Sequence, residues 1–88
     1  MRVLEVNNTA IDLNAQAAPF LPNYTVVAVN TSAETRTLQG SVDAAFTSPV
    51  TLATLAAAGL AGSVQEVTPT YQYIRTSAAS DPVWLLGN

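Results

Sequence analysis

The sequence predicts a single all-β domain, a jelly-roll-like β-sandwich of about eight short strands spanning residues 1–88. Three observations lead to this fold class. Short segments rich in Val, Thr, Ile and Tyr recur along the chain, and several alternate apolar with polar residues. Asn, Ser, Gly or Pro residues separate these segments, as turns require. The chain of 88 residues is long enough for one core only.

The expected strands follow from the local pattern. Residues 24–30, YTVVAVN, give the clearest strand, because β-branched side chains dominate and an asparagine closes it. The turn-forming TSAET comes next, so residues 36–41 are expected to be the hairpin partner of this strand. Residues 18–23, which hold two prolines, and residues 42–49 are expected to be loops. The expected strands are residues 2–6, 10–16, 24–30, 36–41, 50–55, 63–67, 70–77 and 83–87.

One segment fits two structures. In the stretch TLATLAAAGLAG, Leu52, Leu55 and Ala56 fit one face of a helix, and alanine is the best helix former. Two β-branched threonines and two glycines in the same stretch oppose a helix. We expect a strand followed by a loop, with any helix confined to residues 53–61.

The composition argues against catalysis. The chain has no histidine, cysteine or lysine, so it lacks the usual general base, thiol nucleophile and amine nucleophile. No spacing among the acidic residues matches a calcium loop, and a domain this small rarely builds the cleft with two facing carboxylates that glycoside hydrolysis needs. We interpret these acids as solvated surface groups, and we expect no enzyme activity, metal site or cofactor. The acids are Glu5, Asp12, Glu34, Asp43, Glu66 and Asp81.

Charge and hydropathy also restrict the partners. A net charge of −3 with three dispersed arginines argues against nucleic acid, which needs a clustered basic face. No apolar run approaches the roughly 20 residues of a membrane helix. The N-terminal MRVLEVNN lacks the apolar segment that a secretory signal needs. Charged residues are only 10% of the chain, and so neutral a surface is weakly protected against association.

Two apolar segments are candidate contacts with a partner. Phe20 and Leu21 lie between two prolines in an expected loop, where large apolar side chains often mark a contact. Val3 and Leu4 lie in the N-terminal strand, whose residues could extend to a neighbouring chain, and sheet edges without lysine are poorly defended against strand addition. Trp84, in the last strand, is expected to be half-buried.

The arginine in TYQYIRTSA poses a separate question. Tyr71, Tyr73 and Arg75 share one phase of a strand. Arg75 is therefore covered and paired with an acid, or exposed across a tyrosine ring, or exposed with neither role. A covered Arg75 would need a carboxylate such as Glu66 or Asp81. The sequence leaves these alternatives open, and we expect a structural role for Arg75 beside Tyr73.

Several stretches resemble the small β-sandwich proteins of tailed-bacteriophage virions. They are VVAVNTSAETRTLQGSVDAAF, TLATLAAAG, TYQYIRTSA and VWLLGN, within residues 24–88. In such proteins a strand like TLQGS leads to an Asp-Gly turn, a TLATL-like strand, a YxYIR strand and a short apolar strand. Here Asp43 and Ala44 replace the Asp-Gly pair and Pro49 follows, so this loop is expected to be longer. The pattern is also similar to that of discoidin-like jelly rolls, which bind carbohydrate or lipid surfaces.

The resemblance implies a capsid cement (decoration) protein. Such a chain would bind the outer surface of the major capsid protein shell as a homo-oligomer and stabilise that shell. It would be located on the virion after assembly in the host cytoplasm. Phe20, Leu21, Val3 and Leu4 would be its contacts. The alternatives are a carbohydrate-binding or receptor-adhesion module of a virion, or a small tail or neck subunit.

Overall fold

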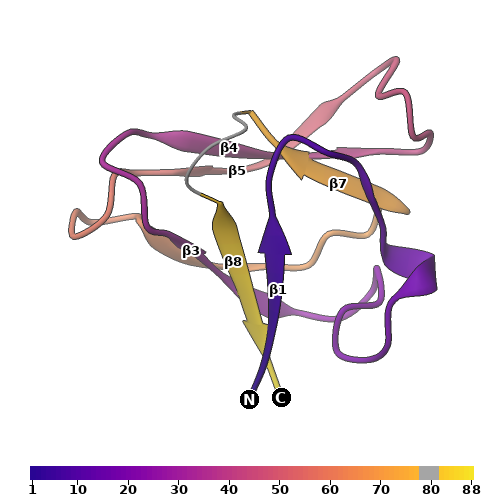
Figure 1. Cartoon of the computed structure of the whole chain (residues 1–88), viewed down its shortest axis with the longest axis horizontal. Coiled ribbons are helices and arrows are strands. Elements are labelled where there is room, and N and C mark those ends of the chain that lie inside the picture. Colours follow the sequence, from indigo (N-terminus) through magenta and orange to yellow (C-terminus); the bar gives the residue numbers. More distant parts are fainter. Residues whose placement is uncertain (78–81) are drawn as a thin grey trace.

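The computed structural model describes residues 1–77 and 82–88, which form two four-stranded antiparallel sheets (Figure 1). The strands are β1 (Arg2–Val6), β2 (Ile11–Asp12), β3 (Val26–Asn30), β4 (Arg36–Ser41), β5 (Val50–Leu55), β6 (Val64–Val67), β7 (Tyr73–Thr76) and β8 (Val83–Gly87). A short 3₁₀ helix, η1 (Leu13–Ala15), follows β2. Sheet A has the strand order β1-β8-β3-β6, and sheet B has the order β2-β7-β4-β5.

The topology is that of one long hairpin rolled into a sandwich. β1 pairs with β8, β2 with β7, β3 with β6 and β4 with β5, and each pair is centred between residues 42 and 47. Rolling the hairpin adds the β3–β8 and β4–β7 pairings, which complete the two sheets. Eight strands in this double-sheet arrangement form a jelly roll, and the predicted fold class is confirmed.

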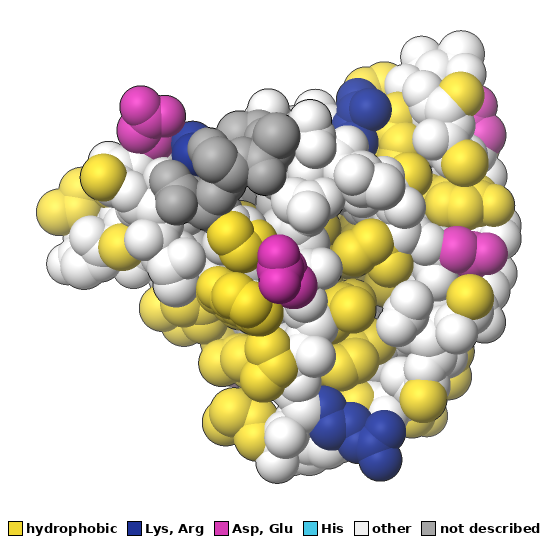
Figure 2. All heavy atoms as spheres, in the orientation of Figure 1, with side chains coloured by type: hydrophobic (Ala, Val, Ile, Leu, Met, Phe, Trp, Pro, Cys, Tyr) yellow, Lys and Arg dark blue, Asp and Glu magenta, His cyan; other side chains and the backbone are white. Residues whose placement is uncertain are grey.

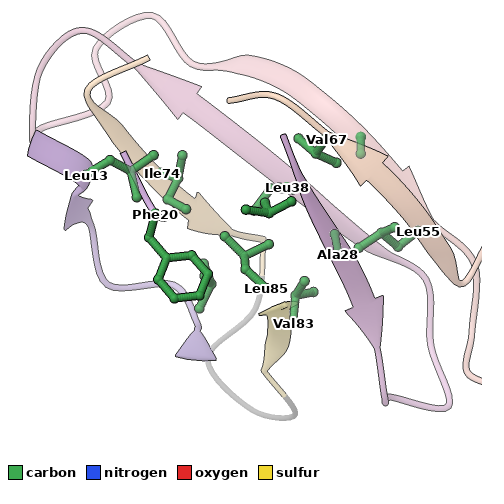
Figure 3. Packing of buried hydrophobic residues seen from close by; sticks show 12 residues of the cluster. Leu13, Phe20, Ala28, Leu38, Leu55, Val67, Ile74, Val83 and Leu85 are labelled. Carbon is green, nitrogen blue, oxygen red and sulfur yellow. The ribbon is translucent and has the colours of Figure 1, made fainter. Parts of the chain in front are cut away.

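The core fills the space between the two sheets (Figure 3). It contains Val6, Leu13, Phe20, Val26, Ala28, Leu38, Ala53, Leu55, Val67, Ile74, Val83 and Leu85. Most of these residues occupy alternate strand positions, because successive side chains of a strand point to opposite faces of its sheet. Leu13 and Phe20 come from the segment between β2 and β3, and this segment therefore contributes to the core as well.

The expected hairpin between residues 24–30 and 36–41 is wrong. β3 and β4 follow each other in the chain but lie in different sheets. Asn30 and Ser32 shape the intervening segment, since the Asn30 Oδ1 accepts from the Ser32 backbone nitrogen at 2.9 Å. The chain crosses between sheets there, which lets both strands bury their inner faces against each other.

Two further expectations concerned local structure. Only Ile11–Asp12 of the expected strand 10–16 is extended, because the Asp12 carboxylate accepts from the Asn14 backbone nitrogen and starts η1. Residues 56–62 form turns and no helix. Gly59 and Gly62 have φ values of +83° and +88°, a left-handed conformation that ends regular structure and suits glycine.

Asn30 is a buried polar side chain, 1% exposed, at the end of β3. Its Nδ2 donates to the carbonyl oxygens of Glu34, Leu55 and Ala56 at 2.8, 3.3 and 2.9 Å. Its Oδ1 accepts from Ser32 on the same crossover. One side chain therefore joins the β3–β4 crossover to the end of β5 and satisfies backbone groups that are buried or partly buried.

We predict that Asn30→Ala lowers the free energy of unfolding by about 2 kcal/mol or more, because buried backbone groups lose their hydrogen-bond partner. The matched control is Asn23→Ala at an exposed position, which should change stability by less than about 0.5 kcal/mol. Urea unfolding of the three proteins gives both values. Equal stability of the Asn30 and Asn23 variants would contradict the assigned role.

Candidate binding surfaces

The two sheets have outer faces of opposite character. In an antiparallel sandwich, the face turned away from the core normally carries polar side chains. Sheet B follows this rule, with Thr37, Gln39, Thr54 and Arg75 among its outer residues. In sheet A, six of the eight outer positions are apolar: both on β3, both on β8, and one each on β1 and β6.

We call this surface of sheet A the apolar face; it consists of Val3, Val27, Val29, Val64, Trp84 and Leu86. The strand register sets Val3, Leu86 and Val27 side by side in one row and the other three in the next row. Val3 and Val64, on the two edge strands, are 52% and 55% exposed, and the four central side chains are half-buried. Figure 2 shows hydrophobic side chains gathered along β8.

Polar side chains border the apolar face. Glu66 extends the first row and Glu5 begins the second, so that two carboxylates stand at opposite corners. Thr25 and Thr68 share a hydrogen bond between their hydroxyls at one end of β3 and β6. Thr31 lies at the other end of β3. An apolar centre inside a polar rim is the usual anatomy of a protein-binding surface.

The sequence contains a signal for this face that strand assignment did not use. A strand with one solvated face alternates apolar and polar residues. VVAV of β3 and VWLL of β8 are apolar at both phases, although these are antiparallel strands. Such runs predict that the core covers one face and that the other face lacks the usual polar side chains.

Arg75 lies on the outer face of sheet B, opposite in phase to the fully buried Ile74. Its Nε donates to the Oε1 of Gln39, across the β4–β7 pairing, at 3.0 Å. The guanidinium carbon lies 4.3 Å from the centroid of the Phe46 ring. This cation–π contact is worth about 0.5–1 kcal/mol at a partly exposed site. Of the alternatives for Arg75, the structure shows a guanidinium that lies across an aromatic ring, and this ring is that of Phe46 instead of a tyrosine.

The turn between β4 and β5 brings Phe46 to Arg75. Phe46 is 5% exposed, outside the core cluster, and has a φ of +52°, which is uncommon for a bulky side chain. The Asp43 carboxylate holds the turn: it accepts from the Ser41 and Thr47 hydroxyls, both at 2.7 Å, and from the Thr47 backbone nitrogen at 3.2 Å. Hydrogen bonds from Thr47, and then from Ser41, lower the pKa of Asp43 below its ordinary value of 3.8.

An open polar hollow of 310 Å³ lies beside Arg75. Its lining residues are Asn8, Gln39, Arg75, Thr76 and Ser77. Asn8 belongs to the β1–β2 connection, which is attached to β7 by a hydrogen bond from the Thr76 backbone nitrogen to the Asn7 carbonyl at 2.8 Å. The hollow therefore combines a guanidinium with amides and hydroxyls, and the hydrogen bonds of sheet B hold most of these groups in place.

The prediction of Phe20 as an exposed contact is wrong. Its side chain is 8% exposed, and Figure 3 shows the ring turned into the core near Leu85. A sandwich is open at its ends, and the proline-containing loop closes one end by inserting this ring. Leu21 is half-buried, and Leu4 packs against the core from the inner side of β1. Of the four expected contact residues, only Val3 belongs to the apolar face.

The other expected site residues lie as follows. The aromatic ring that lies against Arg75 is that of Phe46, and the Tyr73 hydroxyl accepts from the Gln72 Nε2 at 3.3 Å. Trp84 is half-buried, on the apolar face rather than in the core. Asp81 lies outside the described residues. Glu66 is exposed on sheet A and has no ion pair with Arg75 within the described part of the chain.

Within residues 1–77 and 82–88, no cluster of three or more acidic side chains could hold a metal ion. The same residues contain no helix long and apolar enough to cross a membrane. Comparison of the chain with protein-family models, curated proteins and solved structures found no match. The outer faces of the two sheets are therefore the features of the molecule that bear on its function.

We predict a pH dependence that originates at Asp43. Because its folded-state pKa lies below the unfolded value, its contribution to stability is present above about pH 4 and is lost as the pH falls through the folded pKa. An NMR titration of the Asp43 carboxyl carbon should give a pKa below 3.8, and Thr47→Val should move it upward. A pKa at or above 3.8 in the unmodified protein would contradict the proposed role of Asp43 in the turn.

Proposed function

We propose that this chain is a structural protein of a virion, a cement protein that docks its apolar face on the outer surface of the capsid shell. The observation that carries the proposal is the apolar face itself. A solvated outer sheet face would normally be polar, whereas six of the eight outer positions of sheet A are apolar and lie side by side, as at a site where a partner docks. The jelly roll is an architecture of many viral capsid domains and of lectins, and it is compatible with this role.

The dimensions of the apolar face favour a repeated contact over a single strong one. Four strands and two rows of side chains span roughly 250 Å², given the usual spacings of a sheet. A standard stable interface needs roughly 800 Å² from each partner. Docking on this face alone is therefore weak. On a shell with many equivalent positions, neighbouring copies that touch one another raise the local concentration for each contact.

Charge is consistent with this form of binding. Within the described part of the chain, only Glu5 and Glu66 carry charge at the corners of the apolar face, and the centre has no charged side chain. Burial of apolar surface provides the attraction, and it depends little on salt. Sheet B, with its hydroxyls and amides, then remains in contact with water. We also propose that copies of the chain associate with one another as a homo-oligomer on the shell.

We predict that Val3→Lys and Val64→Lys each weaken binding to the shell by at least about tenfold, because each places a charge where water is excluded. Val42→Lys is the matched control, since Val42 is 76% exposed in the β4–β5 turn, away from sheet A. Co-sedimentation with purified shells that lack the protein, at low and high salt, measures the effect. Binding should persist at high salt.

Three results would overturn this proposal. Undiminished binding of both edge variants would show that another surface makes the contact. Release of the unmodified protein at high salt would show that charges, not apolar burial, hold the complex together. Absence of the chain from purified particles would reject the virion role itself, and sedimentation of the free protein would then show whether the apolar face joins two copies.

A further inference from the structure

We propose that the polar hollow beside Arg75 binds the carboxylate of an acidic sugar. This second site lies on sheet B, whereas the proposed docking face lies on sheet A, so the two proposals are independent. If the docking proposal holds as well, a chain attached through sheet A would still present this hollow to its surroundings.

The Arg75 side chain is held in a position that suits binding of an anion. Its Nε already donates to Gln39, and Phe46 lies against one face of the guanidinium at 4.3 Å. Two fixed contacts restrict the rotation of the side chain, so little further entropy is lost on binding. The four N–H groups of the two terminal nitrogens have no hydrogen-bond partner among the described residues. Their planar fork fits a carboxylate through two parallel hydrogen bonds.

The charge of the site favours a monoanion. Among the residues that the structure describes, Arg75 is the only charged one in the lining, and the whole chain has a net charge of −3. A phosphate carries close to two negative charges and is usually held by more than one cation or by a helix terminus. A single guanidinium in an acidic protein is better matched to one carboxylate.

The remaining lining favours a sugar over a peptide. Asn8, Gln39 and Ser77 offer amide and hydroxyl groups, which suit a ring that carries several hydroxyls. The hollow of 310 Å³ is at the lower end of the range for small-molecule sites. It lies over β4 and β7, which are both interior strands of sheet B, so no free strand edge is available to pair with a peptide.

The test is a titration of the folded protein with galacturonate oligomers, followed by amide chemical shifts in NMR spectra. We expect shifts at Asn8, Gln39 and Ser77, and at least tenfold weaker binding of neutral galactose oligomers. Arg75→Gln should reduce the affinity for galacturonate at least tenfold. Arg2→Gln changes the net charge equally at an exposed position outside the hollow and should have no effect.

A second variant separates binding from folding. Asn8 is exposed in a connection, so Asn8→Asp should leave the fold intact while it repels a carboxylate and weakens binding severalfold. Equal affinity for the neutral and the acidic oligomers would overturn the proposal, as would an equal loss in the Arg2 variant. Binding of a capped glutamate-containing peptide in preference to the sugar would assign the site to an acidic protein segment. No binding of any of the probes at millimolar concentration would reject the site.

Discussion

The whole fold depends on one constraint, the pairing of strands that are equally distant from the turn between β4 and β5. This arrangement joins the most distant parts of the chain, β1 with β8, and the closest, β4 with β5, in a single antiparallel pattern. The turn is therefore the centre of the topology. Asp43 holds it by accepting three hydrogen bonds, and the Phe46 ring joins it to Arg75 on β7, which is three strands further along the chain. Arg75, one of few charged residues in the sequence, therefore holds the central turn against sheet B.

The same constraint sorts the side chains into two surfaces of different chemistry. Sheet A receives both ends of the hairpin together with β3 and β6, and its two central strands, β8 and β3, are apolar on their outer as well as most of their inner positions. Sheet B receives the central strands β4 and β5, whose outer positions are threonine and glutamine. A small domain with few charges cannot rely on electrostatic repulsion to remain monomeric. The outer faces of the two sheets therefore suit different partners. Sheet A can bury apolar surface, and sheet B can donate hydrogen bonds.

Much of the fold could be predicted from the sequence, because short β-branched segments between turn residues leave few alternatives to a sandwich. The positions of seven of the eight strands are close to expectation for this reason, and the expected strand 10–16 is reduced to Ile11–Asp12. The pairing of β3 was not predictable in the same way: TSAET is a good hairpin turn, and the buried Asn30 makes it a crossover instead. Asn30 has the inward phase of its strand, so a polar residue in a core position was the available signal.

The candidate surfaces were less predictable than the fold. The environment of a side chain depends on what the rest of the chain lays over it. Phe20 has the features of an exposed loop residue, yet it closes an open end of the sandwich. The partner of Arg75 comes from a turn 29 positions away in the sequence, and no local pattern pairs the two. The apolar face could have been found, since two strands lack alternation, but only the register shows that their outer residues form one continuous patch.

The position of β8 has a consequence for how the protein folds. β8 lies between β1 and β3 and supplies Val83 and Leu85 to the core. Without it, β1 has no partner in sheet A and β3 is paired on one side only, with β6. Figure 1 shows the two ends of the chain side by side, as the β1–β8 pairing requires. Sheet A is therefore completed only when the two strands most distant in the sequence meet, and pairing over such a separation slows folding and leaves apolar strands open to aggregation in the meantime.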